Sequence, residues 1–201
     1  IISTGMCFKK EIIKTFQTAK KYNKSGIALL KCTSLYPATD NTINLLAIKK
    51  FIETFKIPIG YSDHTKDNLA SILAVSLGAK IIEKHFTLNK KQKGVDHKFS
   101  SEPKDLKILI SAIRRAEILF GDSLIRPHSK EIPNRNKFFR GILAVKNIIK
   151  NEKLTTLNIG LKRSLNYKTS LNSKYYNQVL GKRAKQNIKI DDKILFNKLK
   201  K

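Results

Sequence analysis

Residues 68–87 decide the fold, and they read Asn-Leu-Ala-Ser-Ile-Leu-Ala-Val-Ser-Leu-Gly-Ala-Lys-Ile-Ile-Glu-Lys-His-Phe-Thr. The stretch from Asn68 to Leu77 consists of small and apolar residues without charge, and it predicts a buried helix. Gly78 and Ala79 break that helix, and Lys80 to Phe86 then predict a short strand. A helix that leads directly into a strand is the repeating unit of a parallel α/β sheet.

The same alternation of strand and helix extends over the first 120 or so residues. The predicted strands are the strand end at Ile1–Ser3, Gly26–Thr33, Ile57–Ser62 and Lys80–Phe86. The predicted helices are Lys9–Tyr22, Asn41–Phe55, Asn68–Leu77 and a long helix that Ser101 caps, with Pro103 in its first turn and its end near Gly121. Four such units fit either half of a (β/α)8 barrel or a small doubly wound sheet.

The pattern changes after Gly121. Two prolines and many polar residues make residues 122–136 the best candidate for a linker between a first domain, residues 1–121, and a second, residues 137–201. Short apolar segments separated by polar turns predict a small, loop-rich second domain, and these segments are Gly141–Val145, Leu157–Leu161 and Ala184–Ile190.

The chain is strongly basic. It has 41 Lys and Arg against 15 Asp and Glu, a net charge of +26. Such a charge is typical of proteins that bind nucleic acid or anionic membranes, or else reflects lysines spread over solvated helix faces. Aromatic residues are not interleaved with the lysines as stacking platforms would be, so we expect neither a nucleic acid nor a membrane partner. Part of the charge can attract anionic substrates.

A few residues bear on the cellular compartment of the protein and on whether the given sequence is a piece of a longer chain. The longest nearly apolar stretch, Leu69 to Ala79, is too short to span a bilayer. The two cysteines, Cys7 and Cys32, have no paired or metal-ligand spacing, which suits a reducing cytoplasm. The sequence opens with Ile1 inside a predicted strand, and we therefore expect it to be a piece of a longer chain.

Polar residues gather where the predicted strands end. Ser62 and His64 point to one side of their strand, and Glu83 and His85 do likewise on the next. His64 and His85 lie 21 positions apart, one strand–helix unit, so their imidazoles can meet at one divalent ion. The alternative is two independent histidines, one of them bonded to a local backbone group.

Other polar residues near strand ends have two readings each. Asp96, in the loop after His85, is placed either to accept hydrogen bonds from sugar hydroxyls or to make an Asx turn. Ser3, Ser34 and Ser62 are placed either to hold a phosphate or to serve as ordinary turn residues.

The motifs in this order resemble the N-acetylneuraminate (sialic acid) synthase family, with its legionaminic and pseudaminic acid synthases. The resemblance extends along nearly the whole chain, more loosely after Gly121. The matching segments are Ile2–Met6, Cys32–Pro37, Gly60–Thr65, Gly78–Thr87 and Asp96–Ser100 with Glu102-Pro103. The resemblance implies the second half of a (β/α)8 (TIM) barrel over residues 1–121, followed in residues 137–201 by an antifreeze-like (SAF, β-clip-type) domain.

The resemblance also implies the chemistry. His64 and His85 would hold a divalent metal, foremost Mn²⁺ with Mg²⁺ or Co²⁺ as alternatives, and Glu83 would lie beside it. The reaction would be an aldol-like condensation of phosphoenolpyruvate with N-acetylmannosamine or a related N-acyl sugar. The metal would polarise the sugar aldehyde.

The resemblance assigns residues to both substrates. Ser3, Ser34 and Ser62 would contact phosphoenolpyruvate, and Tyr36 and Asp96 would face the sugar. A second subunit would complete the site, since in the family a homodimer exchanges its C-terminal domains.

Arg163 would then be offered to the sugar's N-acyl group across that homodimer. Here Ser164-Leu165-Asn166-Tyr167 follows, where most relatives have Pro-Gly-x-Gly. The family's first four barrel strands are also missing, so we expect this piece to lack full activity by itself. The alternative function is a catalytically inactive, truncated binding or assembly module.

Overall fold

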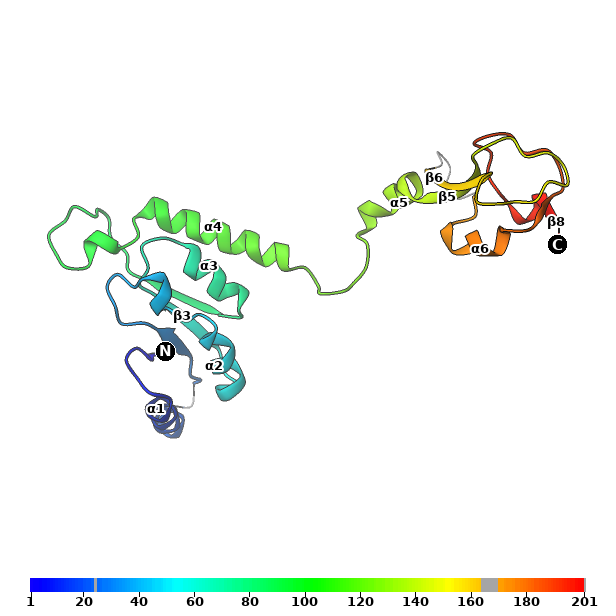
Figure 1. Ribbon diagram of the computed structural model, residues 1–201. Helices are drawn as coiled ribbons and strands as arrows, with labels where there is room; N and C mark the ends of the chain where they lie inside the picture. The colour runs from blue at the N-terminus through cyan, green and yellow to red at the C-terminus, as the bar shows by residue number, and fades with distance from the viewer. Residues whose placement is uncertain (24, 164–169, 201) are drawn as a thin grey trace. The chain divides into compact units, whose positions relative to one another are not determined.

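The computed structural model describes residues 1–23, 25–163 and 170–200 (Figure 1). The chain divides into two compact units, Ile1–Ser123 and Leu124–Lys201. Each unit has its own buried apolar cluster, and each is described by itself.

The first unit is a parallel α/β structure. Its elements in chain order are β1 (Ile2–Ser3), α1 (Lys9–Tyr22), β2 (Leu29–Cys32), α2 (Ala47–Phe55), β3 (Ile59–Asp63), α3 (Leu69–Ser76), β4 (Ile81–Lys84) and α4 (Pro103–Phe120). The strands form one sheet in the order β1-β2-β3-β4, and all three pairings are parallel. The prediction of a parallel sheet with crossover helices is therefore confirmed.

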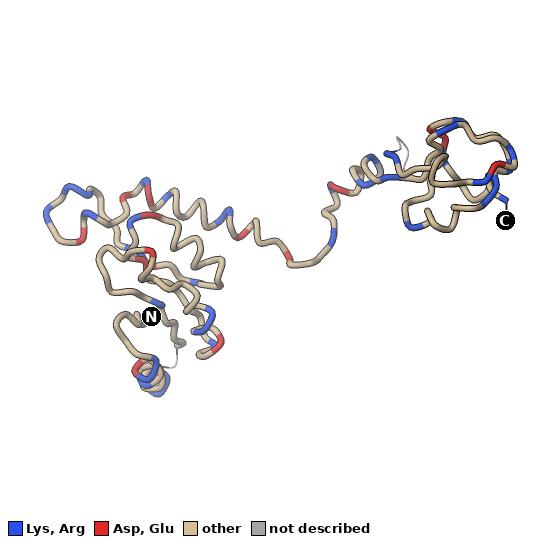
Figure 2. Tube along the Cα trace, viewed as in Figure 1, with Lys and Arg blue, Asp and Glu red and all other residues tan. Residues whose placement is uncertain are grey.

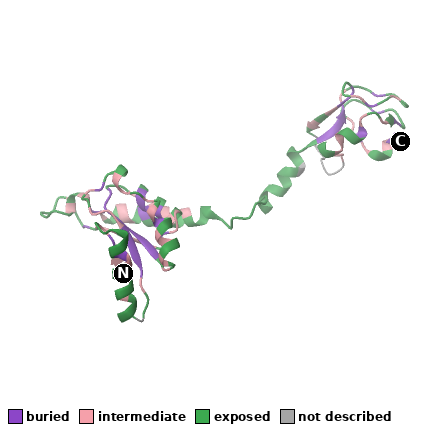
Figure 3. Ribbon diagram, turned by 60° about the horizontal axis from the view of Figure 1, so that its bottom comes forward, coloured by how far each residue is buried: buried purple, intermediate pink, exposed green. Residues whose placement is uncertain are grey.

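The core of this unit lies between the sheet and the helices. Side chains from one face of the strands pack against α1, α2 and α3, and they are Leu29, Ile59 and Tyr61 with Ile12, Ile48, Ala70 and Ala74. The middle strands β2 and β3 are almost entirely buried and are drawn in purple in Figure 3, whereas α1 is largely exposed. Because side chains alternate along a strand, the residues between these core positions point to the opposite face of the sheet.

Two predicted helix starts differ from the structure. The helix predicted over Asn41–Phe55 is a 3₁₀ turn at Asp40–Thr42 followed by α2. Asn44 lies between them with a φ of 43°, a conformation that asparagine tolerates and that interrupts a helix. The N-cap of α4 is Glu102 and not Ser101. Ser101 is buried and donates its N–H to the carbonyl of His85 at 2.8 Å, so its backbone already belongs to the strand end.

The second unit contains short elements. They are α5 (Ile132–Phe138), β5 (Arg140–Ala144), β6 (Ile159–Arg163), α6 (Tyr176–Val179), β7 (Arg183–Ala184) and β8 (Leu199–Lys200). β5 pairs with β6 and β7 with β8, both antiparallel. The apolar segment Gly141–Val145 overlaps β5 and Leu157–Leu161 overlaps β6, whereas Ala184–Ile190 begins in β7 and continues with an isolated bridge from Ile188 to Ile148. The segment 122–136 is not irregular throughout, since α5 begins inside it.

Lys and Arg are distributed over helices and loops of both units (Figure 2). Among the described residues, no helix combines the length and the apolar character that a membrane crossing requires.

Candidate active site at the strand ends

The candidate site begins with one hydrogen bond between neighbouring strands. Ser62 on β3 is the register partner of Glu83 on β4. Ser62 is buried, and its Oγ donates to Glu83 Oε1 over 2.6 Å. Both side chains leave the sheet on the face opposite the apolar core and at its carboxyl end, which is where parallel α/β barrels carry their functional groups.

His64 follows directly after β3 and is held in one tautomer. Its ring is buried, and Nδ1 lies 2.8 Å from the carbonyl oxygen of Thr33. Because a carbonyl oxygen can only accept, Nδ1 of His64 carries the proton in this bond, which leaves the lone pair of the neutral ring on Nε2. Nε2 lies 3.4 Å from Ser62 Oγ.

His85 follows β4 and meets His64. The two ring centroids are 5.2 Å apart, and the ring planes are inclined at 80°. Nδ1 of His85 lies 3.7 Å from Asp96 Oδ2, and the two side chains are 30% and 60% exposed. The sequence-based expectation that these two histidines meet at adjacent strand tips agrees with this geometry.

Two aromatic side chains complete a wall around the histidines. The Tyr36 ring lies 4.1 Å from the His64 ring and 5.5 Å from the His85 ring. Phe99 lies 5.7 Å from Tyr36 and 5.4 Å from His85. Desolvation, with negative charge from Cys32, Asp96 and Glu83, raises the pKa of Tyr36, so its hydroxyl stays protonated at neutral pH. Sequence reasoning gave Phe99 no role, although Phe99 stands inside the quoted segment Asp96–Ser100.

The donor set suits a metal with open coordination positions. A ligating histidine normally donates its second ring N–H to a carbonyl or carboxylate, as His64 does to Thr33. Among the described residues, no group of three or more His, Cys, Asp and Glu side chains is placed to hold an ion. A metal here would therefore have two imidazole ligands, and the remaining positions would be left to water or substrate.

The three serines belong to three neighbouring strands of the sheet or to the chain that follows them. Ser62 lies between His64 and Glu83, as described above. Ser34 follows β2, and its Oγ lies so close to Gly5 that a Cβ on Gly5 would be 2.0 Å from it. Ser3 is an exposed residue of β1, paired in register with Leu30. Ser34 therefore contacts the loop after β1.

Arg163 belongs to the second unit. It is the last residue of β6, and its guanidinium carbon lies 5.4 Å from the centre of the Phe138 ring. The segment Ser164–Tyr167, which departs from the family pattern, lies outside the described residues.

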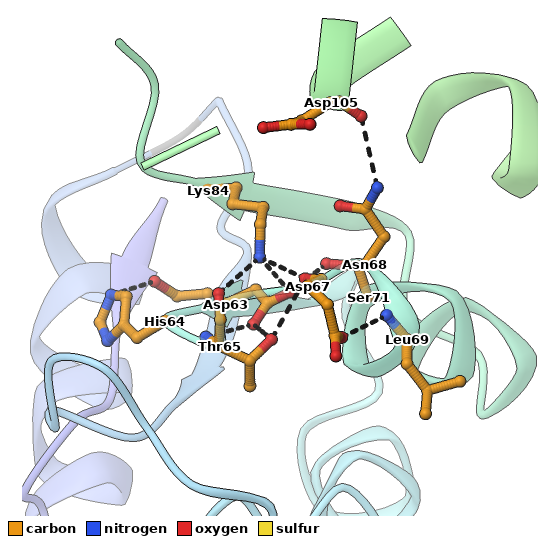
Figure 4. A network of polar contacts seen from close by, with 10 residues as sticks. Asp63, His64, Thr65, Asp67, Asn68, Leu69, Ser71, Lys84 and Asp105 are labelled. Carbon is orange, nitrogen blue, oxygen red and sulfur yellow. Dashed lines mark hydrogen bonds and ion pairs between the residues drawn. The ribbon is translucent and has the colours of Figure 1, made fainter. Parts of the chain in front are cut away.

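A lysine and an aspartate behind the site were also missed by sequence reasoning. Lys84 and Asp63 form an ion pair of 2.9 Å with side chains that are 4% and 0% exposed (Figure 4). Because each stands between two residues of the site, alternation directs both to the helix-covered face. The burial of both charges singles out this pair in the structure, but the sequence alone does not reveal which lysine is buried.

Comparisons with known proteins identify the family of the chain. The model of the NeuB family matches residues 1–124. The chain is 39% identical over 196 residues to the N,N'-diacetyllegionaminic acid synthase of Campylobacter jejuni, which covers 96% of this chain and 58% of that protein. It is 36% identical over 192 residues to the pseudaminic acid synthase of the same organism, covering 96% of this chain and 55% of that protein.

A solved structure supports the same relationship. The N-acetylneuraminic acid (sialic acid) synthetase of Leptospira borgpetersenii, solved in complex with citrate, is 38% identical with a TM-score of 0.60, over 68% of this chain and 49% of that one. The chain thus spans a little over half the length of the curated relatives that it matches. On the family match and on this identity, the chain belongs to the NeuB family of sialic acid synthase-like enzymes.

Proposed function

We propose that this chain carries the metal-binding half of a sialic acid synthase-type active site. The reaction joins phosphoenolpyruvate to N-acetylmannosamine or a related N-acyl sugar and gives a nine-carbon 2-keto-3-deoxy sugar acid and phosphate. The observation that carries the proposal is the meeting of His64 and His85, with the His64 Nδ1 proton donated to Thr33. Family membership and the names of the relatives support it.

His64 and His85 would hold the divalent ion, Mn²⁺ first and Mg²⁺ or Co²⁺ as alternatives. When bound, the ion would withdraw electrons from the aldehyde oxygen of the open-chain sugar. His64 supplies no proton from Nδ1 in this scheme, since that proton is donated to Thr33.

The residues of the chain position the reacting groups and move one proton. Carbon 3 of phosphoenolpyruvate forms the new bond to the aldehyde carbon, which leaves positive charge at carbon 2. Water adds at carbon 2 and gives up one proton, which balances the proton gained by the former aldehyde oxygen. Phosphate then leaves as the C–O bond breaks, the second proton of that water goes to the phosphate, and carbon 2 becomes a ketone. Glu83, with Oε1 fixed by Ser62, is placed to take the proton of that water on its free carboxylate oxygen.

Substrate contacts follow from the positions of the side chains. Ser34, and Ser3 farther along the sheet, would donate to the phosphoenolpyruvate anion. Ser62 would contact the anion as well, but it would donate to it only when its single hydroxyl proton turns away from Glu83. Tyr36 and Asp96, both more than half exposed at the rim, would face the sugar. Tyr36 keeps its proton and can donate to a sugar oxygen, because its pKa is raised.

The larger assembly is part of the same proposal. The four-stranded sheet would be half of a (β/α)8 barrel, and residues 137–201 would form an antifreeze-like domain that completes the pocket of a partner subunit in a homodimer. The short antiparallel pairs β5-β6 and β7-β8 are compatible with such a domain. A cytoplasmic location suits the two free cysteines, Cys7 and Cys32.

A complementation assay tests the proposed function. The 201-residue chain is mixed with the part of the Campylobacter legionaminic acid synthase that it does not match, and phosphate release from phosphoenolpyruvate is followed with several N-acyl sugars. We expect turnover only in the mixture with a divalent metal, and none after His64→Ala in this chain. Robust turnover in a metal-free mixture, or an unaffected His64→Ala variant, would contradict the proposal.

A further inference from the structure

The buried ion pair between Asp63 and Lys84 lies directly behind the candidate site. The two residues are register partners on β3 and β4. Asp63 stands between Ser62 and His64, and Lys84 stands between Glu83 and His85. Because side chains alternate along a strand, Asp63 and Lys84 point to the helix-covered face of the sheet. The residues on either side of each of them point to the opposite face, where the candidate site lies.

Every hydrogen-bonding position of the pair is used. Oδ1 of Asp63 accepts from the N–H and the Oγ1 of Thr65, both at 2.8 Å. Oδ2 accepts from Ser71 Oγ at 2.5 Å and from Lys84 Nζ at 2.9 Å. An ionised carboxylate offers about four acceptor sites, and all are filled.

The ammonium group of Lys84 is equally satisfied. Besides Asp63, Nζ donates to the carbonyl oxygens of Thr65 at 3.0 Å and of Asp67 at 2.8 Å (Figure 4). An ammonium has three protons, and here each has an acceptor. Lys84 thus ties the end of β4 to the chain that leaves β3 immediately after His64.

These bonds act where the backbone ladder has ended. β3 ends at Asp63 and β4 at Lys84, so His64 and His85 lie beyond the last strand residues. The side-chain network is what joins the two strand tips at this level. Fixing the tips in turn fixes the directions in which the two imidazoles leave the chain.

Stability alone does not account for such a pair. Removing two charges from water costs free energy that their attraction recovers only with good geometry, and apolar replacements of buried ion pairs are often as stable. What an apolar pair lacks is direction, because it cannot bind the carbonyls of Thr65 and Asp67.

We infer that Asp63 and Lys84 are positioning residues that hold the imidazoles of His64 and His85 in a common arrangement from the opposite face of the sheet. The geometric part concerns this chain alone, and its use in metal binding rests on the proposed function.

The test replaces the pair with uncharged groups of similar size, Asp63→Asn with Lys84→Met. Asparagine keeps an acceptor for Thr65, and methionine keeps the length of the lysine stem. The matched control is Asp191→Asn with Lys162→Met, which removes an ion pair of the same residue types in the second unit, at 2.6 Å and with side chains 65% and 41% exposed. Circular dichroism and thermal unfolding establish that each variant is folded.

Two readouts separate positioning from mere structure. Ring proton NOEs between His64 and His85, with the ring ¹⁵N shifts that report the tautomer of His64, are recorded in the chain without metal. We expect the double variant to remain folded while the ring-to-ring NOE is lost and the tautomer becomes mixed, and the control to match the parent chain. Titration with Co²⁺ alone should show affinity weakened by about 10- to 100-fold in the double variant only.

The outcomes are distinguishable. A folded double variant that keeps the NOE and the single tautomer overturns the inference. If the double variant does not fold, Ser71→Ala decides, because it removes only the Ser71 bond to Asp63. Altered ring signals in folded Ser71→Ala support the inference, and unchanged ones overturn it. If the parent chain binds no Co²⁺, the proposed metal site fails, while the NOE comparison still decides the positioning role.

Discussion

Ser62 orients the carboxylate of Glu83, its partner on the neighbouring strand of the parallel sheet. The buried hydroxyl of Ser62 donates a hydrogen bond of 2.6 Å to the exposed side chain of Glu83. The Ser62 hydroxyl is uncharged, so it does not compete with the carboxylate for the proton that Glu83 is proposed to take. One carboxylate oxygen is therefore fixed in place while the other stays open to solvent and substrate.

Ser62→Ala should remove this bond and lower the free energy of unfolding by about 1 kcal/mol. The loss stays modest because Glu83 is exposed and water replaces the hydroxyl. Urea unfolding followed by circular dichroism measures it. Ser76→Ala serves as the control, since Ser76 is an exposed helix residue bonded only to the Ile72 carbonyl, and we expect no loss there. Equal effects of the two substitutions would contradict the importance of the Ser62 bond.

His64→Ala and His85→Ala should each weaken Mn²⁺ or Co²⁺ binding by at least 10-fold, because each removes one of only two imidazole ligands. Calorimetric titration of the 201-residue chain measures the affinity, and circular dichroism checks the fold. His128→Ala is the control, because His128 lies in the second unit and caps a 3₁₀ turn there. Unchanged binding of one equivalent of metal in both site variants would show that the histidines are structural.

Glu152 gives a pH dependence to the second unit. Hydrogen bonds from the Ile149 N–H and the Asn158 amide hold the pKa of Glu152 below its ordinary value of 4.5. A depressed folded pKa contributes stability that is present above the unfolded pKa and is lost as the pH falls through the folded pKa. We expect NMR titration to give a Glu152 midpoint below 4.5, and Glu152→Gln to remove this part of the acid destabilisation. A midpoint at or above 4.5 would exclude these bonds in solution.

Arg163→Ala should weaken sugar binding by about 1.5–3 kcal/mol, the value of a hydrogen bond to a charged group, and leave phosphoenolpyruvate binding nearly unchanged. The Michaelis constants of the two substrates in the active assembly measure this difference.

Mixing Arg163→Ala subunits with His64→Ala subunits tests the exchange of domains. With exchange, each heterodimer contains one pocket without a lesion and one with both, so activity returns. Without exchange, both pockets carry a lesion. Confirmed heterodimers that recover no activity would show that Arg163 does not act in a partner's pocket.

Hydrophobic periodicity was sufficient to predict a helix whose apolar spacing and end residues indicate the same bounds. The helix predicted over Lys9–Tyr22 has those bounds in the structure, because its apolar spacing and its ends agree. The start of α2 was wrong because a single residue, Asn44, adopts a positive φ, which no periodic pattern encodes. The strand pairing of the second unit was not predicted, because bridges such as Ile148 to Ile188 join residues that are far apart in the sequence.

The candidate site likewise has features that strand geometry predicts and features that depend on tertiary packing. Alternation along β3 and β4 predicted that Ser62, His64, Glu83 and His85 share a face, because that follows from strand geometry alone. Phe99 and the partnership of Asp63 with Lys84 were not predicted, since contacts between a loop and a strand, and the burial of a lysine, depend on tertiary packing.

The uneven exposure around the histidines has a consequence for the evolution of new specificities. Tyr36 and Asp96 are 51% and 60% exposed, whereas Asp63 and Lys84 are almost fully enclosed. Substitution at an exposed position rarely costs much stability, whereas an enclosed charge that loses its partner is strongly destabilising. Under the proposed function, in which Tyr36 and Asp96 face the sugar, preference for one amino sugar over another can therefore drift through these outer residues at little risk to folding, while the enclosed ion pair behind the site is inherited intact.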